Sequence, residues 1–116
     1  MHDIMRIMRK YLCEDAIKLL ALQEMDDDPV WREKQGYYNR STGKVTEAGK
    51  KHIKDLNEKL KYYDSRIEDN SLDTKNLRKL KDDLREYERN NPKVNPKKEL
   101  AEEEYYAYMS VIFDRW

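Results

Sequence analysis

The chain has 116 residues, of which 41% are charged, and its 24 Lys and Arg residues balance its 24 Asp and Glu residues. This neutrality excludes a general attraction to nucleic acid or to an anionic membrane, and the apolar share of 38% is too low for a thick globular core. A single cysteine, Cys13, excludes an internal disulfide framework and fits a reducing cytosol. We therefore expect a soluble cytoplasmic protein without a membrane-spanning segment.

Helix-favouring residues dominate the composition, because Ala, Glu, Lys, Leu and Arg make up 52 of the 116 residues. This share approaches the roughly one-half that is typical of long helices and coiled coils. We expect one domain, residues 1–116, of the mostly α class with four to five helices. Its predicted centre is an antiparallel, coiled-coil-like helical hairpin, and one short β-hairpin is expected around residues 30–46.

The first helical region is predicted over residues 3–25, where apolar residues recur at helical spacing. A break near Cys13 is expected, since Glu14 and Asp15 are acids that favour the first turn of a second helix. The acids at 26–28 and Pro29 should end this region, because a residue before proline avoids the α conformation.

Residues 30–46 form the part of the chain that favours strands. Its strand-forming residues flank a turn at residues 41–43, and they are Val30, Trp31, Tyr37, Tyr38 and Val45. Thr46 is expected to cap the next helix. Gly49 falls in the first turns of that helix, and a glycine there indicates either close backbone packing or disorder at the helix start.

A helical hairpin is predicted over residues 47–89, with a turn near residues 68–73 and Asp73 as the N-cap of its second helix. Two apolar stripes step through this region by alternating threes and fours, which places each on one side of a helix. The predicted seam consists of Ile53, Leu56, Leu60, Tyr63 and Ile67 on one helix and Leu77, Leu80, Leu84 and Tyr87 on the other. The same stripes also fit an intermolecular coiled coil, so a homodimer is an alternative to the intramolecular hairpin.

Two prolines and three asparagines interrupt the chain over residues 90–96, and a last helix is predicted over residues 97–115. From Tyr105 to Phe113 this helix is apolar or aromatic on nearly every side, so it must be covered. The first helical region and a partner protein are the two candidates for that cover.

Catalytic and metal-binding motifs are absent from the sequence. It has no glycine-rich phosphate loop and no nucleophile elbow, and Cys13 has no sequence-near partner at zinc spacing. His52 is interpreted as a surface histidine beside the seam. We expect no enzymatic activity, no metal and no cofactor.

A basic segment between Pro29 and Lys54 is the strongest candidate for partner binding. It holds seven Lys and Arg residues against two Glu residues, a net charge of +5, with aromatic residues between them. Such a surface can contact phosphates and stack bases, or can contact protein. The candidate partner-binding residues are Trp31, Arg32, Tyr37, Tyr38, Arg40, Lys44, Lys50 and Lys51.

Residues Val45–Ile53 resemble the point at which the wing of a winged-helix regulator enters its next helix, within a similarity that covers residues 36–53. This resemblance implies a nucleic-acid-binding regulator. Such a regulator places a polar or basic recognition helix ahead of the wing, whereas here the apolar run Ala16–Leu22 is followed by acids.

The expected function is therefore that of a small, non-enzymatic intracellular protein that binds another protein, with nucleic-acid binding as the alternative. The Lys- and Tyr-rich composition and short length are similar to those of small phage accessory proteins. That similarity implies inhibition or modulation of host machinery by occlusion.

Overall fold

The computed structural model describes residues 3–67 and 71–115, which form seven helices and one two-stranded antiparallel sheet. The mostly α class with a small β-hairpin is confirmed, although the helices outnumber the four to five expected. In chain order the elements are α1 (Asp3–Tyr11), α2 (Glu14–Asp27), α3 (Pro29–Lys34), β1 (Tyr38–Asn39), β2 (Lys44–Val45), α4 (Glu47–Arg66), α5 (Thr74–Asn90), α6 (Pro96–Glu99) and α7 (Glu102–Ile112).

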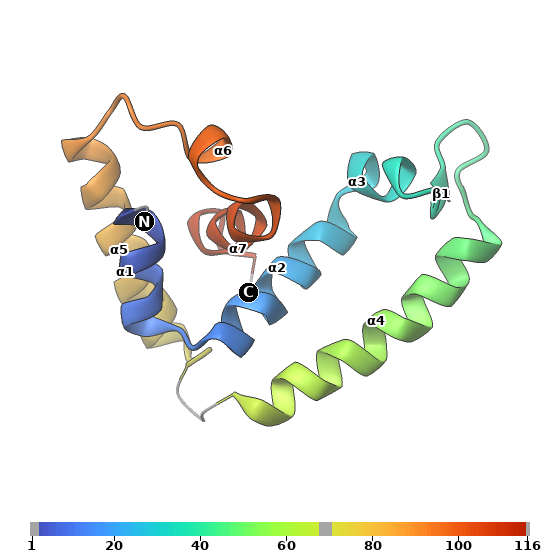
Figure 1. Ribbon diagram of the computed structural model, residues 1–116, viewed down its shortest axis with the longest axis horizontal. Coiled ribbons are helices and arrows are strands. Elements are labelled where there is room, and N and C mark those ends of the chain that lie inside the picture. Colours follow the sequence, from blue (N-terminus) through green and yellow to red (C-terminus); the bar gives the residue numbers. More distant parts are fainter. Residues whose placement is uncertain (1–2, 68–70, 116) are drawn as a thin grey trace.

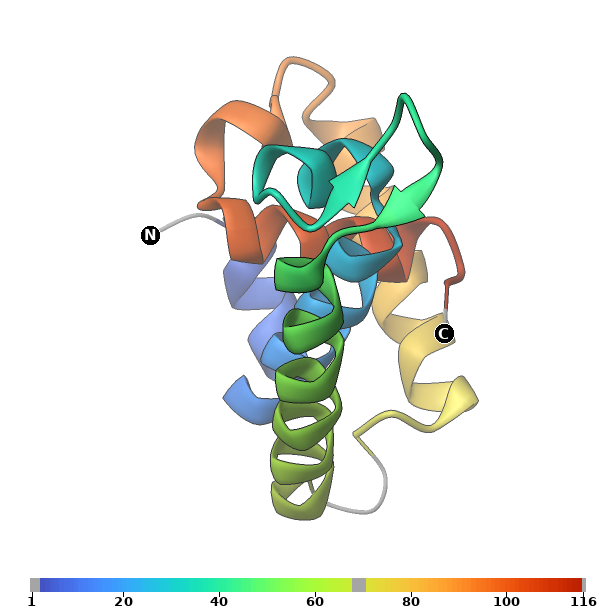
Figure 2. The ribbon, with the colours of Figure 1, turned by 90° about the vertical axis from the view of Figure 1, so that its right-hand side faces the viewer.

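The elements are arranged as a body and an arm. Helices α1, α2, α5, α6 and α7 form the body, and α3, the β-hairpin and α4 form the arm, which covers residues 29–67 (Figure 1). Helix α2 runs out of the body alongside α4, and the β-hairpin closes the far end of the arm (Figure 2). The molecule is accordingly elongated, with extents of 44 × 34 × 23 Å.

The hydrophobic core lies within the body. Helix α7 lies against α2, and α5 packs on α1 and α7, which agrees with the expected pairing of the N- and C-terminal helical regions. The buried residues of this cluster are Ile4, Met5, Met8, Leu12, Ala16, Ile17, Leu20, Ala21, Leu77, Leu80, Leu84, Leu100, Ala107, Tyr108, Val111 and Ile112.

The first helical region breaks at Cys13, as expected, and α2 begins at Glu14. The expected strand character of Val30 and Trp31 is wrong, because both residues lie in α3. Asp28 caps this short helix by accepting a hydrogen bond from the Val30 backbone N–H at 2.9 Å, and Pro29 has the fixed φ that suits a first helical position. Asp28 therefore both ends α2 and starts α3.

The β-hairpin lies within the predicted range and pairs Tyr38 with Val45. Gly43 turns the chain with a φ of +69°, a conformation that glycine adopts without steric strain. Thr46 then caps α4 as predicted, because its hydroxyl oxygen accepts a hydrogen bond from the Gly49 N–H at 3.0 Å. The same hydroxyl donates to the Gly36 carbonyl at 2.6 Å, which joins the helix start to the loop after α3.

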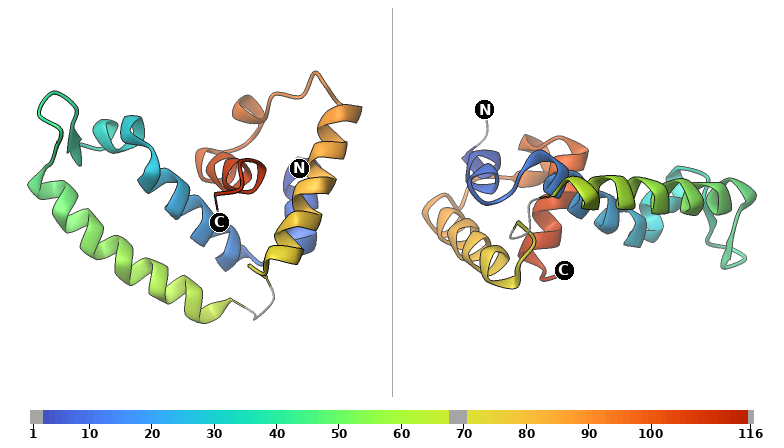
Figure 3. Two further views of the ribbon diagram at one scale, coloured as in Figure 1. Left: turned by 180° about the vertical axis from the view of Figure 1, so that it is seen from behind. Right: turned by 90° about the horizontal axis from the view of Figure 1, so that it is seen from below.

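The predicted seam between α4 and α5 does not form as a coiled-coil hairpin. Helix α4 packs against α2, whereas α5 packs against α1 and α7, and the two helices diverge (Figure 3). Of the predicted seam residues, Leu77, Leu80 and Leu84 are fully buried in the body, while Ile53 is 42% exposed. The α5 stripe packs on α1 and α7, which offer it more apolar surface than α4 does, whereas α4 lies against α2 with Leu56 buried and Ile53 exposed.

The rest of the predicted seam lies at the margins of the structure. Leu56 is buried on the inner side of α4 but is separate from the main core. Leu60 and Tyr63 are half-buried. Ile67 and Tyr87 pack on the edge of the core. Part of the predicted turn, residues 68–70, lies outside the described residues, and Asp73 caps α5 through the Lys75 N–H at 3.4 Å.

The predicted C-terminal helix is divided into α6 and α7. Leu100 stands between them in an extended conformation with its side chain in the core, and α7 begins where Glu104 accepts a hydrogen bond from the Ala101 N–H at 3.1 Å. Residues 90–96 interrupt the chain as predicted, since α5 ends at Asn90 and α6 starts at Pro96. Among the described helices, none combines the length and the apolar character needed to cross a membrane.

Candidate functional site

Three aromatic rings join the β-hairpin to the arm's two helices. Trp31 comes from α3, Tyr37 from the loop that follows, and His52 from α4. The Tyr37 and His52 rings are stacked, with centroids 4.1 Å apart and planes 7° apart, and Trp31 lies 5.9 Å from Tyr37 and 5.7 Å from His52. Gly49 allows this approach, because a Cβ there would lie 2.0 Å from the Tyr37 carbonyl oxygen. The close backbone packing predicted from this glycine is confirmed.

His52 is not the surface residue that the sequence indicated. Its side chain is 16% exposed, and its Nε2 atom lies 3.4 Å from Oδ1 of Asp26. Asp26, His52 and Arg32 line a cavity of about 30 Å³, which has room for a water molecule. The spacing of Gly49, His52 and Leu56 by three and four residues puts them on one side of α4, so this side, rather than the Ile53 side, faces inward.

The predicted partner-binding residues fall into two groups. Trp31, Arg32, Tyr37 and Tyr38 are half-buried and contact one another, with the Arg32 guanidinium 4.9 Å from the centre of the Tyr38 ring. These four residues hold the hairpin in place.

The second group is exposed and consists of Arg40, Lys44, Lys50 and Lys51. Arg40 lies 3.6 Å from Glu33 and Lys50 lies 3.3 Å from Glu47, so two of these cations already have an acidic neighbour. Exposed pairs of this kind contribute little to stability and leave the cations accessible.

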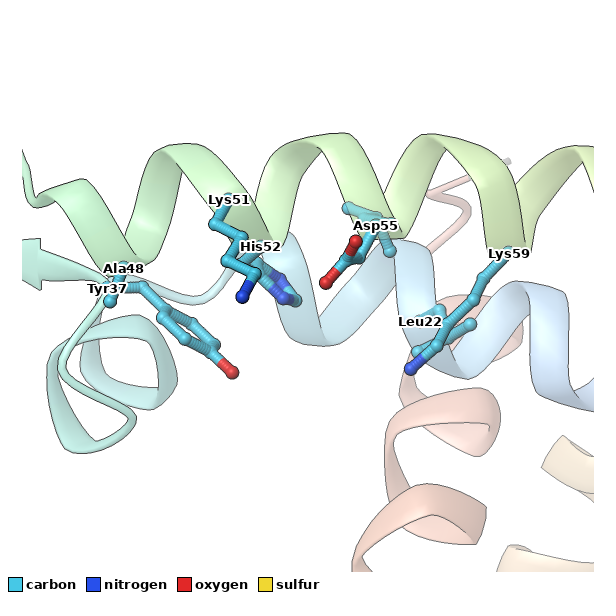
Figure 4. A pocket seen from close by; sticks show the side chains of 8 residues that line it. Leu22, Tyr37, Ala48, Lys51, His52, Asp55 and Lys59 are labelled. Atoms are coloured by element: carbon cyan, nitrogen blue, oxygen red, sulfur yellow. The ribbon is translucent and has the colours of Figure 1, made fainter.

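A polar pocket of about 270 Å³ lies between α4, α2 and Tyr37 (Figure 4). Lys51, Asp55 and Lys59 extend from one side of α4, and Leu22 and Leu56 supply the apolar part of the lining. Asp55 stands between the two lysines and offsets part of their charge, which makes this pocket a weak site for an anion.

A larger groove, of about 510 Å³, lies where the arm meets the body. Its lining comes from α3 and the residues next to it, from α6 and the residue that follows it, and from α7 between Glu102 and Met109. The lining residues are Asp28, Val30, Trp31, Lys34, Gln35, Lys97, Leu100, Glu102, Tyr105, Tyr106 and Met109. We call this the α3–α7 groove; apolar and aromatic side chains make up about half of its lining residues.

Two hydrogen bonds link α7 to Trp31 of α3 and to Asp28, the N-cap of α3, and fix the shape of the α3–α7 groove. The Trp31 indole Nε1–H donates to Glu102 Oε1 at 3.0 Å, and the Tyr106 hydroxyl donates to Asp28 Oδ2 at 2.7 Å. Burial and the bond to Asp28 raise the pKa of Tyr106. Burial also acts to raise the pKa of Asp28, but the hydrogen bonds from Tyr106 and from the backbone of Val30 and Trp31 outweigh it and lower that pKa. The ionised form of Asp28 is therefore the form that the fold stabilises.

Sequence reasoning missed the contribution of α7 and α6 to this groove. The aromatic character of residues 105–113 indicated a helix that needs cover, and it did not indicate that Tyr105, Tyr106 and Met109 would share a groove with Trp31. The position of Trp31 beside α7 depends on the direction in which α2 packs on the body, because α3 follows directly after α2. Local sequence patterns do not specify that packing direction.

Metal binding and known relatives offer no further guide to the site. Within residues 3–67 and 71–115, no three His, Cys, Asp or Glu side chains are grouped so that they could hold a metal ion. Comparison with protein-family models, with curated proteins and with solved structures finds no match to this chain. The α3–α7 groove and the exposed cations are the features of this chain that bear on its function.

Proposed function

We propose that this protein is a non-enzymatic binding protein that holds a segment of another protein in the α3–α7 groove. The observation that carries the proposal is the convergence of apolar and aromatic side chains from α3 and α7 on one preformed groove. These two helices are far apart in the chain, and hydrogen bonds between them set the groove before any partner arrives. Preformed binding surfaces lose less conformational entropy on association.

The composition of the groove fits a protein partner. Trp and Tyr dominate the energetics of protein interfaces because they bury large surfaces at low entropic cost. Val30 is 51% exposed at the groove, beside half-buried Trp31, Tyr105 and Met109. An apolar side chain of the partner that covers these residues would gain about 25 cal/mol for each Å² of apolar surface removed from water.

Binding in this groove would act by occlusion. In this proposal the protein has no catalytic role, so its effect on a partner would come from covering the segment that it holds. Inhibition or modulation of the partner is the simplest consequence, and it matches the mode expected of a small accessory protein.

Affinity capture with matched variants tests this proposal. Val30→Ser removes an exposed apolar side chain from the groove, and Phe113→Ser removes one of similar exposure, 56%, from outside the groove lining. We expect the wild type and Phe113→Ser to retain the same defined partner from a lysate, while Val30→Ser loses at least half of it. Equal retention by both variants would refute the groove as the binding site.

A nucleic-acid interface is a second candidate, supported by the four exposed cations Arg40, Lys44, Lys50 and Lys51. The helix in the place of a recognition helix, α2, packs against α7 and α4, which weighs against the winged-helix mode. If the cations contact phosphates, oligonucleotide affinity should fall steeply with salt and Lys44→Glu should weaken it. Absence of oligonucleotide binding at low salt would eliminate this candidate.

A further inference from the structure

We propose that one internal water molecule is bound where α2, α3 and the start of α4 meet, and that it joins the arm to the end of α2. Its three protein partners are Asp26 from α2, Arg32 from α3 and His52 from α4. This water site is separate from the α3–α7 groove, because no residue lines both. Its existence therefore does not depend on what the groove binds.

Three polar atoms at this junction are buried and unpaired. Oδ1 of Asp26, Nε of Arg32 and Nε2 of His52 are closed off from bulk solvent, and none has a hydrogen-bond partner within residues 3–67 and 71–115. The Asp26 and His52 atoms lie 3.4 Å apart, which is beyond the usual range of about 2.7 to 3.2 Å for such a bond. Native proteins rarely leave buried polar groups unsatisfied, so a further hydrogen-bonding group is expected among these three atoms.

The cavity lined by these three residues has the size of a water molecule. Its volume is about 30 Å³, which exceeds the roughly 10 to 15 Å³ that one water needs and is too small for an organic ligand. A buried water typically makes about three hydrogen bonds, and this lining supplies three unpaired polar atoms. The remaining lining residues are Tyr37, Val45, Gly49 and Ile53.

The charges beside the cavity favour water over an ion. The Arg32 guanidinium repels a cation, and the Asp26 carboxylate repels an anion. Water is neutral and serves both groups, because it donates a hydrogen bond to Oδ1 of Asp26 and accepts one from the Nε–H of Arg32. Nε2 of His52 makes the third bond, as an acceptor when it is unprotonated and as a donor when it carries a proton.

This water strengthens a junction that has little apolar packing. Gly49 and Leu56 are the buried residues of α4, so the arm depends on polar contacts to keep its place. A bond through water is enthalpically nearly as favourable as a direct one. Because the three polar atoms are closed off from solvent, the water can leave only when the arm opens locally. Its residence time therefore reports how often the arm opens.

Two NMR measurements on the full-length protein test for this water. Gly49 is a buried lining residue, and cross-peaks between its Hα protons and water should have opposite signs in laboratory-frame and rotating-frame Overhauser spectra. That sign change is the signature of a long-lived water molecule. Relaxation dispersion of water ¹⁷O detects bound water without interference from exchanging protein protons. We expect the wild type to show both signals.

Variants assign the signals to this site. Asp26→Leu replaces the carboxylate by an apolar side chain with the same branching, so it should lose the Gly49 cross-peaks and the ¹⁷O contribution of one water molecule. Asp27→Leu is the matched control, because Asp27 is exposed, adjacent in α2 and outside the cavity lining, and it should match the wild type.

His52→Phe provides a second variant in case Asp26→Leu does not fold. It keeps a ring beside Tyr37 and removes the third partner of the water, so it should lose the same two signals. Circular dichroism shows which variants remain helical.

Three results would overturn the proposal. Absence of the Gly49 cross-peaks from the wild type would show that Asp26 and His52 close into a direct contact. A ¹⁷O dispersion unchanged in Asp26→Leu and His52→Phe would place any bound water elsewhere. An equal loss in Asp27→Leu would show that the signals report the general integrity of α2, with no role for the Asp26 carboxylate.

Discussion

The body and the arm are built from similar apolar stripes and differ in how much of each stripe is buried. In the body, α5 buries Leu77, Leu80 and Leu84 completely between α1 and α7. In the arm, the 20-residue α4 buries Gly49 and Leu56. The comparison teaches that a helical stripe predicts a buried side, while the depth of burial depends on how many neighbouring helices meet it.

Polar and aromatic contacts take the place of a deep core in the arm. The stacked Tyr37 and His52 rings, and the Thr46 hydroxyl bond to Gly36, hold the hairpin against α4. Regions with few buried apolar contacts open more readily than packed cores. We therefore expect the arm to unfold locally before the body does.

The largest expected effect on the free energy of unfolding comes from truncating a buried leucine to alanine in each of the two regions. Leu80→Ala should lower the free energy of unfolding by about 2 to 5 kcal/mol, because it leaves a cavity in a core closed on all sides. Leu56→Ala should lower it by about 2 kcal/mol or less, because the thin arm can close over the site. Urea-induced unfolding followed by circular dichroism measures both values. Equal losses would show that arm and body are packed to the same depth.

A smaller effect is expected where the arm depends on a glycine. At an open helical position Gly→Ala stabilises by up to about 1 kcal/mol. At Gly49 the new Cβ would meet the Tyr37 carbonyl oxygen and the Val45 side chain, so Gly49→Ala should destabilise by about 1 to 3 kcal/mol.

Thermal unfolding and the NMR shifts of the His52 ring report on this change, because displacement of the hairpin would separate that ring from Tyr37. Ala48→Gly, at the exposed neighbouring position, is the control and should leave the ring shifts unchanged. Stabilisation by Gly49→Ala would contradict the close approach of hairpin and helix.

The smallest effect is expected at the junction between the two regions. The pKa of Asp28 is lowered in the folded state, so its ionised form stabilises the fold at pH values above its ordinary pKa near 4, and this contribution is lost as the pH falls through the lowered value. Asp28→Asn keeps an N-capping side chain and removes the charge.

The variant should therefore be less stable than the wild type at pH 7, and the difference should shrink toward zero at acid pH. Paired urea titrations across that range measure it. A difference that does not change with pH would show that the Asp28 charge has no part in joining arm and body.

Local signals in the sequence predicted the elements well. Thr46, Asp73 and the proline-rich break at residues 90–96 mark helix ends through capping and backbone chemistry, which act within a few residues. The strand character expected of Trp31 failed for a local reason too, since the Asp28 cap and Pro29 outweighed the strand preference of the side chains.

The pairing of helices and the candidate groove were beyond the reach of the sequence. The stripe of α5 is compatible with any apolar helix, and the choice of α1 and α7 over α4 depends on the total area buried by the whole fold. His52 was misplaced because the inward side of α4 contains Gly49, whose lack of a side chain hid it from the apolar pattern. The aromatic residues of α3 and α7 are evident in the sequence, whereas their common groove depends on the packing of helices that are far apart in the chain.

Hydrogen exchange of the full chain, measured by mass spectrometry with and without the partner recovered by affinity capture, tests the central claim most directly. If the α3–α7 groove holds the partner, added protection should appear over residues 29–35 and 97–109, and α4 should exchange as before. Added protection confined to residues 38–54, with none over α6 and α7, would contradict the account and move the binding site to the hairpin and its cations.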